Sequence, residues 1–254
     1  MRVRVLGCSG GIGGELRTTS FLVDEDIALD AGTGLGNLSL EQLARIDHVF
    51  LTHSHMDHVA CLPFLLDTVG LSRDRPVTLH ATRETLDILS EHLFSWKLWP
   101  DFRVIPSPEK PAVRYAPLSV GETVRIGSRA ITALPANHVV PAVGYWLDSG
   151  AGGLVFSGDT TVNPELWKTV NNINNLRYLL IETAMSDREY DLAVVSKHLC
   201  PTMLKDELAG LSPAVQVYLT HFKPREAALI MDQVTALMPG VDIRMLQQET
   251  VFEF

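Results

Sequence analysis

LTHSHMDHVA, residues 51–60, is the stretch that decides the fold of this chain. The apolar, β-branched run 47–52 comes directly before His53. In the run 59–69, apolar residues recur at helical spacing. The stretch therefore lies where a strand ends and a helix is about to begin. It sets four potential metal ligands within a few positions, namely His53, His55, Asp57 and His58.

These four side chains divide between two centres. Alternation along the extended part puts His53 and His55 on one side, and the turn into the helix carries Asp57 and His58 round to another. Imidazoles and carboxylates at this spacing suit two adjacent divalent ions, with zinc the best match and manganese or iron also suitable. The alternative, a helix cap that happens to be rich in histidine, is disfavoured because histidines that can become positively charged make poor caps.

Composition describes an ordinary globular chain. Its 254 residues are 46% hydrophobic and 20% charged, and no linker divides them, so we expect one domain spanning residues 1–254. The net charge of -9 and the absence of any Lys/Arg run argue against nucleic acid as a partner. A small anionic substrate remains compatible with this charge, because bound divalent ions reverse the local field.

The N-terminus and the cysteines indicate the compartment. Residues 1–11 alternate as a strand and then reach glycine, without a long apolar stretch or a cleavage site, so we expect no membrane segment. The three cysteines are widely spaced and form no CxxC pair, which favours a reducing, cytoplasmic location over a disulfide framework.

The rest of the chain alternates runs of strands with helices. Strands are expected at 3–8, 20–24 and 26–30, a helix capped by Ser39 follows, and several strands lie between residues 113 and 158. Each half is rich in strands and closed by helices, which indicates the α/β class and a four-layer αβ/βα sandwich, with two mixed sheets face to face and helices outside. The glycine-rich segment 10–14 could suggest a dinucleotide loop, but hairpin strands follow it where that loop needs a βαβ unit.

Three further ligand-type residues stand where predicted strands end: His138, Asp159 and His221. Taken singly, each could be a surface group or a turn former. Together with residues 53–58 they indicate a site built at one edge of the two sheets.

These motifs resemble the metallo-β-lactamase superfamily. LDAG at Asp30, HSHMDH, His138, SGDT at Asp159 and LTH at His221 occur in the family's order. The resemblance implies one metal on His53, His55 and His138, a second on Asp57, His58 and His221, and Asp159 bridging them. Flavodiiron relatives carry Glu at the position of His55, which disfavours a redox role.

Within the superfamily, the chain looks most like class II 3′,5′-cyclic-nucleotide phosphodiesterases. The likeness rests on HMDHVACLPFLL, on the aromatic HLFSWKLWPDF, and on IETAMSDRE with SKHLCPTMLKDEL and YLTHFKP. It implies hydrolysis of cyclic nucleotides to 5′-nucleotides by a metal-bridging hydroxide. Met56 departs from the pattern, since a Leu is usual there. Ribonuclease Z is similar too, although its tRNA-binding arm is not evident.

The chemistry of a diester adds a requirement. Its leaving alkoxide is strongly basic and needs a proton from a group outside the metal ligands. His198 is the predicted donor, with Glu182 orienting its ring, as in the Glu and His pair of ribonuclease Z; the alternative is a histidine that merely begins a helix. Asp57 completes the predicted catalytic set, and Asp30 is expected to support a metal-bound histidine without binding metal itself.

The aromatic segment offers a substrate surface. Phe94, Trp96, Trp99 and Phe102 could each belong to the core, but Pro100 prevents one regular helix, so part of the segment should form a loop at the site and stack a nucleobase. The predicted partner is thus a small phosphodiester, and a homodimer is compatible with the sequence. A di-iron oxygen or redox sensor stays open as a different class of function.

Overall fold

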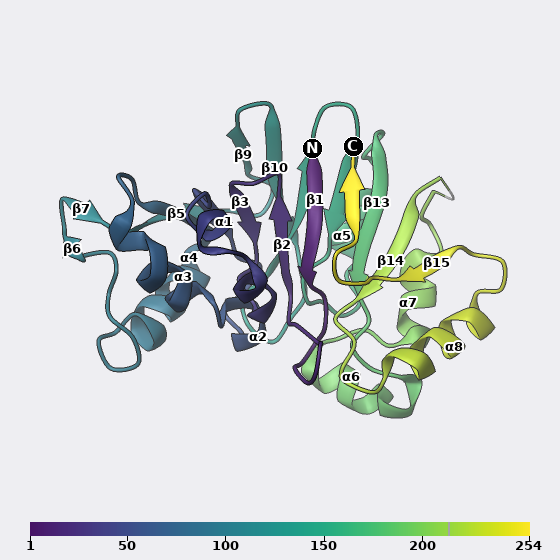
Figure 1. Cartoon of the computed structure of the whole chain (residues 1–254). Coiled ribbons are helices and arrows are strands. Elements are labelled where there is room, and N and C mark those ends of the chain that lie inside the picture. The colour runs from purple at the N-terminus through teal and green to yellow at the C-terminus, as the bar shows by residue number, and fades with distance from the viewer. Residues whose placement is uncertain (213) are drawn as a thin grey trace.

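Two seven-stranded sheets form the centre of the computed structural model, which describes residues 1–212 and 214–254 (Figure 1). The first sheet has the order β16 (Val251–Glu253), β1 (Arg2–Gly7), β2 (Ser20–Val23), β3 (Ile27–Leu29), β4 (His48–Phe50), β5 (Val77–Thr82) and β8 (Val113–Leu118). The second has the order β15 (Ile243–Met245), β14 (Gln216–Thr220), β13 (Leu176–Glu182), β12 (Gly153–Phe156), β11 (Val143–Asp148), β10 (Arg129–Pro135) and β9 (Thr123–Ile126).

The two sheets share one pairing pattern. From β16 to β3 each pair is antiparallel, and from β3 to β8 each pair is parallel. The second sheet repeats this order, antiparallel from β9 to β12 and parallel from β12 to β15. The two mixed sheets predicted from the sequence are therefore confirmed.

Helices cover the outer faces of the sheets. They are α1 (Leu40–Leu43), α2 (Met56–Val59), α3 (Leu62–Val69), α4 (Arg83–Ile88), α5 (Pro164–Val170), α6 (Tyr190–Ser196), α7 (Pro201–Leu208) and α8 (Ala227–Leu237). In Figure 1, α1, α3 and α4 lie outside the first sheet, and α7 and α8 lie outside the second. The expected cap of α1 is present: the Ser39 hydroxyl accepts a hydrogen bond from the Gln42 N–H, and Gln42 Oε1 accepts one from the Ser39 N–H.

Three apolar clusters hold these layers together. The central one, between the sheets, contains the fully buried rings of Phe21, Phe50, Tyr145 and Phe156. The other two lie between each sheet and its helices. Because strands carry apolar residues on both faces, the sheets are buried on both sides, and their exposed polar chemistry is concentrated at strand ends.

The sequence did not reveal three features of the fold. The terminal strand β16 pairs with β1, so the two ends of the chain lie side by side (Figure 1). Helix α6 precedes the predicted proton donor, and β6 (Pro106–Ser107) forms a small hairpin with β7 (Lys110–Pro111). All three are short, and short elements give little periodicity to detect.

Candidate metal centre

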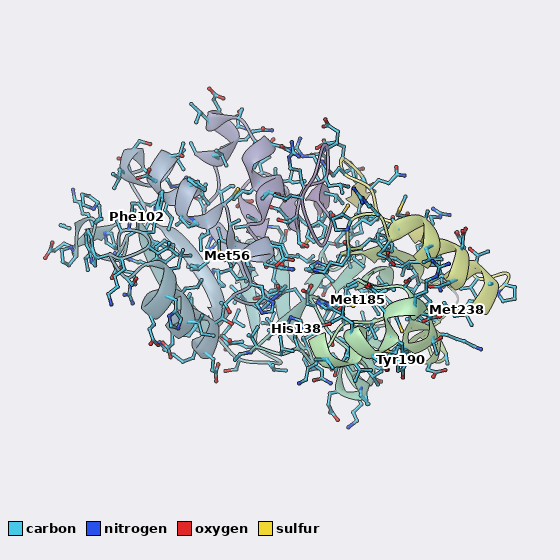
Figure 2. The ribbon with its side chains drawn as sticks, turned by 90° about the horizontal axis from the view of Figure 1, so that it is seen from below. Met56, Phe102, His138, Met185, Tyr190 and Met238 are labelled. Carbon is cyan, nitrogen blue, oxygen red and sulfur yellow. The ribbon has the colours of Figure 1, made fainter. Side chains whose placement is uncertain are left out.

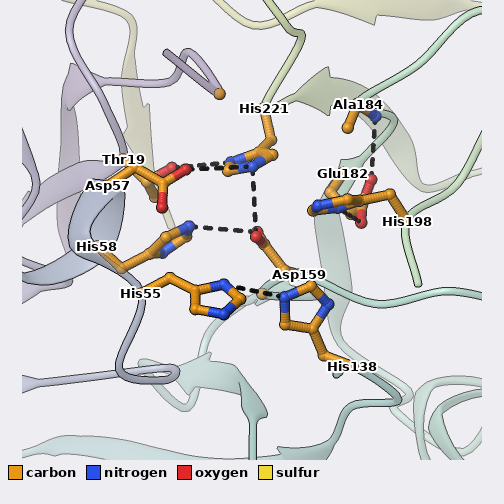
Figure 3. Close-up of polar contacts among 12 residues, drawn as sticks. Thr19, His55, Asp57, His58, His138, Asp159, Glu182, Ala184, His198 and His221 are labelled. Carbon is orange, nitrogen blue, oxygen red and sulfur yellow. Dashed lines mark hydrogen bonds and ion pairs between the residues drawn. The ribbon is translucent and has the colours of Figure 1, made fainter. Parts of the chain in front are cut away.

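The predicted ligands converge at one edge of the sandwich (Figure 3). His138 comes after β10, Asp159 after β12 and His221 directly after β14, while Asp57 and His58 lie within α2. Their ligand atoms form two groups, each within 4.8 Å: one has His53, His55, His138 and Asp159, and the other has Asp57, His58 and His221. The structure thus brings together all seven residues that the sequence singled out as ligands.

Asp159 lies between the two groups. One of its carboxylate oxygens is 3.3 Å from His58 Nε2, and the other is 3.3 Å from His221 Nε2 and 3.7 Å from His53 Nε2. One oxygen therefore faces the second group, and the other lies near a histidine of each group, so the carboxylate has the position that a ligand shared by two ions requires.

The ring nitrogens that point away from the centre have hydrogen-bond partners. His58 Nδ1 is 2.7 Å from Asp30 Oδ2, His138 Nδ1 is 3.1 Å from the Lys197 carbonyl oxygen, and His221 Nδ1 is 3.4 Å from Thr19 Oγ1. An acceptor at Nδ1 fixes the tautomer and leaves Nε2 with a free lone pair directed at the centre.

The inward nitrogens of three rings fit a bound ion. Among the described residues, Nε2 of His53, His58 and His221 is buried and has no hydrogen-bond partner. Such groups are costly unless they have a partner, and two divalent cations, one in each ligand group, would give all three nitrogens one. The donor set therefore fits two divalent ions of the zinc type.

Thr52 is the member of the site that sequence reasoning missed. Its Oγ1 is 2.9 Å from Asp30 Oδ2 and 3.0 Å from His53 Nδ1, and its N–H also donates to Asp30. Asp30 therefore contacts His58 directly and His53 through the Thr52 hydroxyl, and it lies outside both ligand groups. A threonine before a histidine carries no sequence signal for this role.

Burial keeps most of the imidazoles neutral. It lowers the pKa of His138 to about 4 and that of His221 to about 3, and it holds the pKa of His53 well below its ordinary value. Neutral imidazole is the form that binds metal. His58 differs: burial opposes its protonation, but the carboxylates of Asp159 and Asp30 raise its pKa well above the ordinary value.

A second carboxylate–imidazole pair lies beside the ligand groups. His198 Nδ1 is 2.7 Å from Glu182 Oε1, and the Glu182 carboxylate also accepts hydrogen bonds from the N–H groups of Thr160, Ala184 and Leu199. Burial disfavours the charged His198 ring, but the Glu182 charge outweighs it and raises the pKa of His198. One ring nitrogen of His198 lies within 4.8 Å of ligand atoms of Asp159 and His221, so the ring faces the centre.

The aromatic segment corrects the sequence analysis. Phe94 and Phe102 are each 1% exposed and pack in the apolar cluster outside the first sheet, so the prediction that they stack a base is wrong. Figure 2 shows Phe102 well apart from His138. Trp99 is half-buried against Phe64, and Trp96, at 63% exposure, alone presents an open ring. Aromatic residues near a proline signal a break in a helix, but not which side of it faces the core.

The fold and the paired ligand groups define a metal-dependent hydrolase of the αβ/βα type. The model of the β-lactamase superfamily domain matches residues 26–238, and the chain therefore belongs to the metallo-β-lactamase superfamily.

Two kinds of curated relatives are similar in sequence. A probable 3′,5′-cyclic-nucleotide phosphodiesterase of Yersinia pestis is 25% identical over 275 aligned positions, covering 87% of this chain and 78% of the relative. A ribonuclease Z of Bradyrhizobium diazoefficiens is 36% identical over 116 aligned residues, covering 44% of this chain. The matched part spans only 36% of that ribonuclease.

Solved structures agree in fold. Unliganded yeast PDE1 has a TM-score of 0.82 at 17% identity and covers 98% of both chains. The short form of human tRNase Z has a TM-score of 0.69 at 18% identity, with 100% of this chain and 99% of that chain covered. Among the described residues, no helix has the length and apolar character needed to cross a membrane.

Proposed function

We propose that this protein is a dinuclear metal-dependent phosphodiesterase that hydrolyses 3′,5′-cyclic nucleotides to 5′-nucleotides. The observation that carries the proposal is the Glu182–His198 pair beside the ligand groups, because a hydrolase that expels a basic alkoxide needs such a donor. The Yersinia pestis relative supports the substrate class, since it aligns with most of this chain.

The ligands divide into the two groups described above, with Asp159 shared. Bound divalent ions of the zinc type, or manganese or iron, would supply an activated water and neutralise charge on the phosphoryl oxygens. Asp30 and Thr52 hold His53 and His58 in the tautomers that such ions require.

His198 supplies the proton in this proposal. Glu182 accepts from Nδ1–H and keeps the ring oriented, so His198 Nε2 carries the proton toward the centre. In a 3′,5′-cyclic nucleotide the bond between phosphorus and the 3′ oxygen breaks, and that oxygen takes the proton. Burial raises the pKa of Glu182, but three backbone N–H donors and the His198 ring favour its ionised form, which stabilises the positively charged ring.

A ribonuclease Z-like activity is the second candidate. It is favoured by the 36% identity to the Bradyrhizobium diazoefficiens enzyme over the part of the chain that aligns. The same histidine would then protonate a ribose 3′ oxygen within an RNA chain. The net charge of -9 disfavours this candidate, because RNA binding gains from a basic surface.

One substrate panel separates the candidates. Metal-loaded protein would be tested against cAMP, cGMP, the 2′,3′ isomers and a precursor tRNA. We expect turnover of 3′,5′-cyclic nucleotides and none of the tRNA. Cleavage of the tRNA alone would replace the first candidate by the second, and a visible absorption band without hydrolysis would indicate an iron-based sensor.

A further inference from the structure

An open cavity of about 430 Å³ lies beside the metal centre. One wall is the loop 136–142 between β10 and β11, and the other is formed by Thr82 and Glu84 at the start of α4. His138 belongs both to this cavity and to the first ligand group. A substituent of a phosphoryl group held at that group of ligands can therefore extend into the cavity.

Hydrogen bonds fix both walls. The Thr85 hydroxyl donates to the Pro141 carbonyl oxygen at 3.3 Å, which ties the loop to α4. At one end of the loop the Asn137 N–H donates to Thr160 Oγ1, and at the other the Val143 N–H donates to the Thr52 carbonyl oxygen. Since its walls are held at three points, the cavity is preformed.

Glu84 decides which chemistry the cavity accepts. Apart from His138, the other described lining residues are Ala, Asn, Val, Pro and Thr, so Glu84 carries the single full charge. A carboxylate accepts hydrogen bonds but does not donate them. Its negative charge also repels any phosphate other than the one held at the metal centre. The rest of the lining is mixed, with the apolar side chains of the loop next to the polar Thr82 and Asn137. The cavity thus suits a flat, uncharged group that bears N–H donors.

We propose that this cavity holds the nucleobase of the substrate and that Glu84 makes the enzyme prefer guanine. This inference rests on the proposed phosphodiesterase function and names its base. Guanine carries adjacent donors at N1 and N2 that can meet both oxygens of one carboxylate, whereas adenine offers only its 6-amino group.

The kinetic test compares Glu84→Gln with Asp87→Asn. Both residues are exposed on α4, and both changes remove one charge without altering size, but Asp87 does not line the cavity. Glu84→Gln should raise KM for cGMP about ten-fold at unchanged kcat, while bis(p-nitrophenyl) phosphate, which has no base, is unaffected. Asp87→Asn should leave KM and kcat unchanged for both substrates. Equal effects of the two variants, or an equal loss on both substrates, would overturn the assignment.

Binding of GMP gives a test that needs no turnover. In calorimetry on the metal-loaded protein, GMP should bind about ten-fold more tightly than AMP, and Glu84→Gln should abolish that difference. A wild type that hydrolyses no cyclic nucleotide but shows this pattern would refute the proposed function and retain the guanine site. Equal binding of GMP and AMP to the wild type would refute the guanine site, whatever the enzyme hydrolyses.

Discussion

Asp30–His58 and Glu182–His198 are two carboxylate–imidazole pairs, one in each half of the molecule, and in both the carboxylate lies where a strand ends. Asp30 follows β3 and Glu182 ends β13, both carboxylates are fully buried, and each lies 2.7 Å from its histidine. The pairs differ in which predicted ligands lie near the ring. Nε2 of His58 is 3.3 Å from Asp159, and His58 belongs to the ligand group with Asp57 and His221, whereas one ring nitrogen of His198 lies within 4.8 Å of ligand atoms of Asp159 and His221. If the proposed function holds, the comparison teaches that one local arrangement serves metal binding in one half and proton donation in the other, depending on its neighbours.

The carboxylates differ as well. Glu182 accepts three backbone N–H groups besides its histidine, so the protein fixes it with main-chain atoms alone. Asp30 accepts one N–H and the Thr52 hydroxyl, and through that hydroxyl it also orients His53. The Asp30–His58 pair is thus coupled to both ligand groups, whereas Glu182 acts on the single ring of His198.

Replacing His58 by alanine should give the largest effect. The second ligand group then has two of its own residues left besides the shared Asp159, so the second ion should be lost and hydrolysis of both cyclic nucleotides and bis(p-nitrophenyl) phosphate should cease. Elemental analysis together with turnover checks this. Two ions retained in the variant would contradict the ligand role of His58.

Replacing His198 by alanine should separate the two pairs. Both ions and the affinity for substrate should stay, and kcat for a cyclic nucleotide should fall by roughly 10²- to 10⁴-fold, as expected for loss of a general acid. Hydrolysis of bis(p-nitrophenyl) phosphate should fall little, because nitrophenolate leaves without a proton. An identical loss on both substrates would show that His198 acts on the ions or on folding.

Thr52→Val should have an intermediate effect, on the first ligand group and not on the Glu182–His198 pair. Valine keeps the shape but leaves His53 Nδ1 without its acceptor, so affinity for the first ion should weaken by about 10- to 100-fold. Competition with a metal-binding dye measures this affinity. Thr52→Ser is the control and should restore it; a serine variant as weak as the valine variant would assign the effect to packing.

The smallest expected effect is a pH shift from Glu182→Gln. Glu182 raises the pKa of His198 above its ordinary value of 6.5. His198 is therefore fully protonated at pH values well below 6.5, and kcat for a cyclic nucleotide should fall as the pH rises through the raised pKa. Without the carboxylate charge the decline should begin at lower pH. A pH profile of kcat checks the direction, and an unchanged profile would remove Glu182 from the proton-donor pair.

The sequence alone predicted the two mixed sheets and gathered the seven ligand candidates, because strand ends and ligand types follow local patterns. It could not assign Phe94 and Phe102 to the core, since an aromatic ring suits a core and a binding surface equally well.

Only the tertiary structure decided which nitrogen of each histidine faces the centre. That choice depends on hydrogen bonds between residues far apart in the chain. Lys197 orients His138 in this way, and Asp30 orients His53 through the hydroxyl of Thr52, a residue that carries no recognisable motif. The place of Glu84 beside His138 was decided in the same way, because a loop of the second half is tied to the start of α4 in the first. Ligand identity is thus encoded locally, whereas ligand orientation and the walls of the site arise from contacts between segments that meet only when the sheets pack.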